Sequence, residues 1–95
     1  MRESEIEKVL REAVESKEGI AYKFVSPGRV GVPDRLVIFP GGRIYFVELK
    51  TTKGKLSPMQ EREIDRLRRM GHSVAVIDTI EKARGWARIM GLIGD

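Results

Sequence analysis

Apolar residues recur at helical spacing in three segments of the chain and fill four short runs between them. Residues 3–17 are mostly polar except for one stripe, made of Ile6, Val9, Leu10, Ala13 and Val14. Helical spacing returns at residues 57–70 and from residue 79 onward, and the apolar runs are residues 20–25, 34–39, 43–50 and 73–77. Apolar residues three and four apart share one helix face, whereas short apolar runs indicate strands. The pattern therefore predicts the order α-β-β-β-α-β-α.

Turn-forming residues mark the ends of these segments. Gly19 and Gly71 stand where the first two helices would end, and Ser57-Pro58-Met59-Gln60 has the composition of a capping box with proline at the first helical position. Pro40-Gly41-Gly42 separates the second and third strands, as in a hairpin. Both strands are apolar on their two faces, so we expect an α/β fold with helices on both sides of a central sheet.

Composition narrows the class of protein. Ninety-five residues, 41% hydrophobic and 34% charged, are expected to form one globular domain spanning residues 1–95. The absence of cysteine excludes disulfides and thiol chemistry and fits a cytoplasmic location. The N-terminus lacks the apolar region of a signal peptide, and no apolar run has the length of a membrane span. The net charge of +4 favours polyanionic partners such as nucleic acid.

Three charged residues stand at the ends of the central hairpin. If residues 40–42 form a three-residue loop, Asp34 lies directly opposite Glu48 on one face of the sheet. Lys50 follows Glu48 by two positions, so it shares that face about 6.6 Å further along the strand. A two-residue loop would instead place Asp34 opposite Leu49 and separate the charges.

Two carboxylates that meet in this way favour a bound cation. Oxygen ligands without cysteine or histidine partners favour Mg²⁺ or Mn²⁺ over zinc. Such an ion keeps open positions for phosphate oxygens and can activate a bound water. The neighbouring Lys50 ammonium could orient that water or offset charge that develops on the phosphate. These residues together point to hydrolysis of a phosphodiester.

The same residues belong to a wider pattern. Pro33-Asp34, followed after thirteen residues by Glu48-Leu49-Lys50, resembles the PD-(D/E)xK nuclease signature. The segments FVSPGR, GVPDR, VELK and GKLSPMQ together resemble the VRR-NUC family, in its small stand-alone form from phages and bacteria. The resemblance extends from Glu5 to about Ile77. It departs at Val30, because many relatives carry a second basic residue in that loop.

This resemblance implies a restriction-endonuclease-like core, with a mixed central sheet flanked by helices, and Mg²⁺- or Mn²⁺-dependent cleavage of DNA in a phage or bacterial host cytosol. It also implies a preference for branched DNA, Holliday junctions among them. The metal ligands would be Asp34, Glu48, the Leu49 carbonyl and, on the first helix, Glu5. Catalytic roles would fall to Asp34, Glu48, Lys50 and Gln60.

Several of these residues also have structural interpretations. Glu5 could complement the dipole of the first helix, and Gln60 could serve only the capping box. Arg29, Lys53 and Lys55 are candidates for phosphate contacts in loops beside the site, or else ordinary solvated surface. The second helix is expected to carry an ion-paired face, formed by acids interleaved with Arg62, Arg66 and Arg69.

Two rival functions remain open from the sequence. The first is an enzyme of the same fold that cuts flaps, nicked duplex or simple duplex; the second is a DNA-binding or assembly subunit that does not cut. Resolution of a four-way junction needs two cuts, which a two-fold homodimer supplies. Apolar residues gather near the C-terminus, and part of that surface is expected to join the protomers: Trp86, Ile89, Met90, Leu92 and Ile93. Alternatively, the tail folds back on its own sheet.

Overall fold

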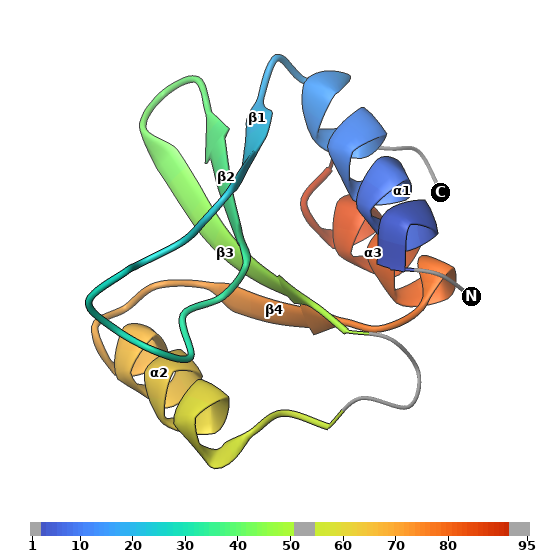
Figure 1. Ribbon diagram of the computed structural model, residues 1–95. Helices are drawn as coiled ribbons and strands as arrows, with labels where there is room; N and C mark the ends of the chain where they lie inside the picture. Colours follow the sequence, from blue (N-terminus) through green and yellow to red (C-terminus); the bar gives the residue numbers. More distant parts are fainter. Residues whose placement is uncertain (1–2, 51–54, 92–95) are drawn as a thin grey trace.

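The computed structural model of the protein describes residues 3–50 and 55–91. It contains a four-stranded sheet, and helices lie on both faces of that sheet (Figure 1). The elements follow in the order α1 (Glu3–Glu15), β1 (Ile20–Lys23), β2 (Arg35–Phe39), β3 (Arg43–Leu49), α2 (Pro58–Arg69), β4 (Val74–Ile77) and α3 (Ile80–Ile89). The predicted order and the α/β class are confirmed. No described helix has the length and apolar character needed to cross a membrane.

The sheet is mixed, with the strands in the order β1-β2-β3-β4. The first three strands run antiparallel and β4 runs parallel to β3. Phe39 pairs with Arg43, which is the register that a three-residue loop requires, so the two-residue alternative is wrong. Gly41 and Gly42 both have positive φ angles (89° and 79°), a conformation that glycine adopts without steric cost. This register brings Asp34, which directly precedes β2, beside Glu48.

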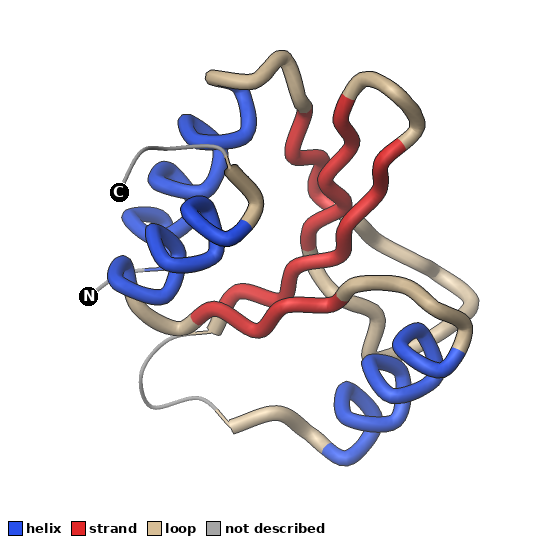
Figure 2. The backbone as a smooth tube through the Cα atoms, turned by 180° about the vertical axis from the view of Figure 1, so that it is seen from behind, coloured by secondary structure: helices blue, strands red, loops and turns tan. Residues whose placement is uncertain are grey.

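One face of the sheet carries the main core. Helices α1 and α3 pack on each other and on this face, as Figure 2 shows from behind. Alternate residues of β2 and β3 point their side chains toward these helices. Val37, Val47 and Trp86 are 0%, 0% and 7% exposed. Each large apolar side chain buried there contributes roughly 1.5–3 kcal/mol. Trp86 also makes an edge-on contact with Tyr45, at 6.4 Å between ring centroids, so it belongs to the hydrophobic core.

The opposite face of the sheet is only partly covered. Helix α2 lies against its β4 side (Figure 1), where Ile64 and Val74 are 3% and 6% exposed. On the same face, beyond α2, Ile20, Tyr22 and Ile44 remain 43–50% exposed. Helix α2 is thus a short second layer, and it stands over the end of the sheet at which Glu48 lies.

The loop between β1 and β2 packs against the start of α2 through Gly31. Its φ angle is 93°, and a Cβ atom there would lie 2.6 Å from the Met59 carbonyl oxygen. Only glycine allows this conformation together with so close an approach. The approach holds the loop and the first turn of α2 together beside the charged end of the hairpin.

Candidate active site

Asp34 and Glu48 are brought together by backbone pairing. Asp34 accepts a hydrogen bond from the Phe24 amide on its carbonyl (2.8 Å), and its Oδ1 accepts another from the Leu49 amide (3.1 Å). Glu48, inside β3, is 4% exposed and points to the face that α2 covers. The expected pair of carboxylates therefore lies on one face of the sheet, at the edge where β3 ends.

Gln60 joins this pair while it caps α2. Its Oε1 accepts a hydrogen bond from the Ser57 amide (2.9 Å), and its own amide donates to Ser57 Oγ (3.1 Å). Its Nε2 donates to Glu48 Oε2 (3.2 Å). One side chain thus serves both as the second member of the capping box and as a partner of the buried carboxylate, so the two interpretations are compatible.

The pKa of both carboxyl groups is raised. Burial raises the pKa of Glu48 from 4.5 to about 7, and the charge of Asp34 adds to the rise, while Lys50 opposes it. The pKa of Asp34 is raised chiefly by burial, although the hydrogen bond that Asp34 accepts from the Leu49 amide lowers this pKa. Two neighbouring carboxylates whose ionised forms are disfavoured form a site that a cation would stabilise.

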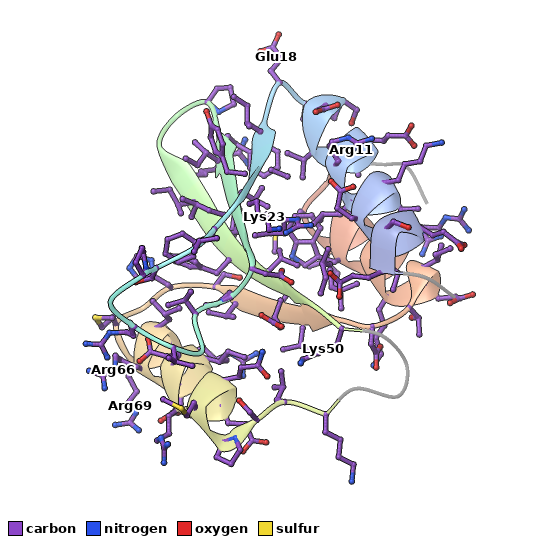
Figure 3. The ribbon with its side chains drawn as sticks, in the orientation of Figure 1. Arg11, Glu18, Lys23, Lys50, Arg66 and Arg69 are labelled. Carbon is purple, nitrogen blue, oxygen red and sulfur yellow. The ribbon has the colours of Figure 1, made fainter. Side chains whose placement is uncertain are left out.

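Lys50 stands at the end of β3 beside these carboxylates. Its amide donates to the Ile77 carbonyl (2.9 Å), which ties its backbone to β4, and its side chain is half-buried near the β4 edge (Figure 3). The positive charge of its ammonium group lowers the pKa of Glu48 by electrostatic attraction to the carboxylate. The three charged residues predicted from the hairpin are therefore gathered in one place.

Glu3, an acid in the first turn of α1, also influences the ionisation of Asp34 and Glu48. Its charge raises the pKa of both Asp34 and Glu48. Glu3 precedes Ile6 by three residues and therefore lies near the buried stripe of α1. Glu5 is two positions, about 200°, further around the helix. It is exposed and, within the described residues, makes no hydrogen bond or ion pair. Glu3 was missed by reasoning from the sequence alone, although its spacing of three residues from Ile6 places it beside the buried stripe and could have indicated it.

The donor atoms at this site fit a hard divalent cation. Because the Lys50 amide points to β4, the Leu49 carbonyl points to the other edge of β3, toward Asp34. Asp34 Oδ2, Glu48 Oε1 and this carbonyl are oxygen donors of the kind that Mg²⁺ and Mn²⁺ prefer. No group of three or more Asp, Glu, His or Cys side chains with metal-binding spacing occurs among residues 3–50 and 55–91. Water and phosphate oxygens would therefore complete the coordination of a bound ion.

The predicted phosphate-contacting residues lie in different settings. Arg29 donates to Glu63 Oε1 (3.0 Å) and is 51% exposed, whereas Lys55 is exposed and Lys53 lies outside the described residues. On α2, Arg66 lies 3.4 Å from Glu63 and Arg69 pairs with Asp65. Both arginines are labelled in Figure 3. The predicted ion-paired face of α2 is confirmed at these two arginines.

The raised pKa of Glu48 predicts that the metal-free protein loses stability as the pH rises. Between about pH 4.5 and 7 the folded state holds a proton that the unfolded state has released, so the free energy of unfolding falls through this range and levels off above it. The loss is on the order of 3 kcal/mol. Chemical denaturation in EDTA at pH 5 and pH 8 measures it.

The matched variant for this prediction is Glu48→Gln, whose amide oxygen can still accept from Gln60. It should exceed the wild type in stability at pH 8, but not at pH 5, because it has no proton to lose. Equal pH dependence of the two proteins would show that Glu48 ionises as an ordinary surface carboxylate.

Comparisons with known proteins identify the family of the chain. The family model described as VRR-NUC domain matches residues 1–79. A curated protein of Acyrthosiphon pisum secondary endosymbiont phage 1, named "Putative nuclease p44", is 56% identical over 79 residues, which are 83% of this chain and 85% of that protein. A solved structure titled "VRR_NUC domain" superposes with a TM-score of 0.81 at 37% identity, covering 87% of this chain and 90% of the other.

Proposed function

Since this chain belongs to the VRR-NUC family and is a nuclease by that relationship, we propose that it is a Mg²⁺- or Mn²⁺-dependent DNA endonuclease that prefers branched DNA. The observation that carries the proposal is that Asp34, Glu48 and Lys50 lie close together, and that Gln60 donates a hydrogen bond to Glu48. A subunit that only binds DNA has no use for two carboxylates aimed at phosphates, because they would repel the backbone.

Each residue has a distinct part in the proposed reaction. Asp34 and Glu48 hold the cation, and the Leu49 carbonyl adds a third oxygen. When bound, the ion supplies Lewis-acid stabilisation of the phosphoryl group and activation of water. Gln60 fixes the rotamer of Glu48, so that Oε1 stays free for the ion. The Lys50 ammonium offsets the negative charge that develops on the phosphate or orients the attacking water.

The DNA backbone would be held by basic residues beside the site. Arg29 keeps exposed N–H groups despite its bond to Glu63, and a guanidinium has five donors in all. With Lys55, and with Lys53 in the neighbouring segment, it would neutralise phosphates on either side of the cleaved bond. A cytosolic location in a phage host or bacterium remains a prediction from the sequence.

We extend the proposal to a homodimer, because paired cuts in a four-way junction call for two sites related by a two-fold axis. On α3, Ile89 is 83% exposed and is available for the predicted contact. Met90 packs against the core, and Leu92 and Ile93 lie outside the described residues. The open sheet face of Ile20, Tyr22 and Ile44 is a second apolar surface available for such a contact.

A cleavage panel tests the proposed function. Labelled four-way junction, flap, nicked duplex and linear duplex are incubated with the protein in Mg²⁺, Mn²⁺ or EDTA. We expect cleavage with either metal, none in EDTA, and the fastest reaction on a branched substrate. Sedimentation equilibrium at micromolar concentration should give a dimer mass. DNA binding without cleavage in either metal would favour the non-cutting subunit, and a persistent monomer that still makes paired cuts would contradict the dimer.

A further inference from the structure

A hollow of about 430 Å³ lies between the β1–β2 loop and α2. Its apolar side is formed by Phe24 and Phe46, whose ring centroids are 6.0 Å apart, together with Leu67 of α2 and Met70, which directly follows that helix. Met70 is 61% exposed, so this wall is open to solvent at one end. Aromatic rings beside a flexible thioether suit a flat, polarisable ligand.

The polar side of the hollow carries one buried acid and two arginines. The side chain of Glu63 is 10% exposed, whereas those of Arg29 and Arg66 are 51% and 58% exposed. Both arginines contact the same carboxylate oxygen, Oε1. Within the described residues this leaves Oε2 as the acceptor for a further donor. The hollow therefore combines an apolar wall, a hydrogen-bond acceptor and two partly free guanidinium groups that can bind a phosphate.

The hollow adjoins the proposed active site along two elements. Phe46 precedes Glu48 by two residues on the same face of β3, which is a separation of about 6.6 Å. Glu63 follows Gln60 by three residues, one helical turn further along α2. A separation near 6.6 Å corresponds to about two stacked nucleotides, or fewer when the strand is unstacked, since a stacked strand rises about 3.4 Å per nucleotide.

We propose that this hollow binds one unstacked nucleotide of the cleaved strand, close to the cleaved phosphate. The base packs against Phe24, Phe46 and Met70 and donates an N–H group to Glu63 Oε2, and its phosphate lies on Arg29 and Arg66. This inference rests on the proposed nuclease function and adds to it a reason for preferring branched DNA. A base held in a duplex enters the hollow only at the cost of unpairing and unstacking, whereas an unpaired base in a flap enters without the cost of unpairing.

Fluorescence of 2-aminopurine tests the proposal. The base analogue is placed, one position at a time, within four nucleotides of the branch in a flap substrate, and binding is measured in EDTA so that no strand is cut. We expect a change in fluorescence at one or two adjacent positions. Phe24→Ala should abolish that change, and an abasic site at the same position should weaken binding by roughly 5- to 100-fold, the usual worth of one base stacked on aromatic rings.

The matched control is Val25→Ala. Val25 neighbours Phe24 in the loop and is 67% exposed, but it does not line the hollow, so its removal should leave the fluorescence pattern unchanged. Equal responses at all positions, or a pattern that survives Phe24→Ala, would overturn the inference. Cleavage of the unsubstituted flap in Mg²⁺ by the same preparation reports separately on the nuclease function, so failure of the inference and failure of the nuclease function can be told apart.

Discussion

Replacement of Asp34 by asparagine is expected to abolish divalent-ion binding and DNA cleavage while the fold is kept. The asparagine Oδ1 can still accept from the Leu49 amide, as Asp34 does at 3.1 Å, so the hairpin end loses a charge and not its hydrogen bond. The Lewis-acid stabilisation lost with the ion is worth several kcal/mol, which corresponds to a fall of more than about 10³-fold in the cleavage rate. Calorimetric titration with Mn²⁺ and single-turnover cleavage measure the two effects.

Glu48→Gln should behave in the same way, because it removes the second charge and keeps the contact with Gln60. Normal Mn²⁺ binding in both variants would rule out a metal site between these carboxylates. The same titration compares the two acids of α1. Glu3→Gln should weaken Mn²⁺ binding several-fold, since the charge of Glu3 reaches both carboxyl groups, whereas Glu5→Gln should not. The reverse order would restore the role of Glu5 that the sequence suggested.

Replacement of Lys50 by alanine should slow cleavage by roughly 10²–10⁴-fold and leave junction binding almost unchanged. The backbone hydrogen bond from residue 50 to the Ile77 carbonyl is kept in this variant. Because the Lys50 side chain is only half-buried, its removal should cost little stability. Single-turnover rates at saturating enzyme separate the chemical step from binding. The expected signature is a lower rate at an unchanged dissociation constant measured in EDTA.

Lys23→Ala is the control for this experiment, because Lys23 is an exposed lysine at the end of β1. It tests whether the loss of any positive charge slows the reaction. A slower reaction in both variants, or near-normal cleavage by Lys50→Ala, would mean that Lys50 contributes only to the general attraction of DNA.

The local sequence was enough to predict the elements and to limit the hairpin to two possible registers. Helical and strand-like runs of apolar residues fixed the order α-β-β-β-α-β-α, because burial of a stripe or a strand depends on spacing along the chain. Pro40-Gly41-Gly42 allowed a three-residue or a two-residue loop, each with its own register, and the pairing of Phe39 with Arg43 in the structure selected the three-residue loop. Once that register was given, the meeting of Asp34 and Glu48 followed from counting residues.

Other features depend on contacts between segments that are distant in the sequence. The sequence by itself determined the elements and the hairpin, since these follow from neighbours along the chain, and it predicted the pair of carboxylates for the three-residue register. Only the tertiary structure showed that Gln60 reaches Glu48 while it caps α2, that Glu3 acts on the carboxylates, and that Phe24 lines a hollow with α2. These three results depend on how α1, α2 and the loop pack on the sheet, and spacing within a single element carries no information about the side chain that another element will bring to it.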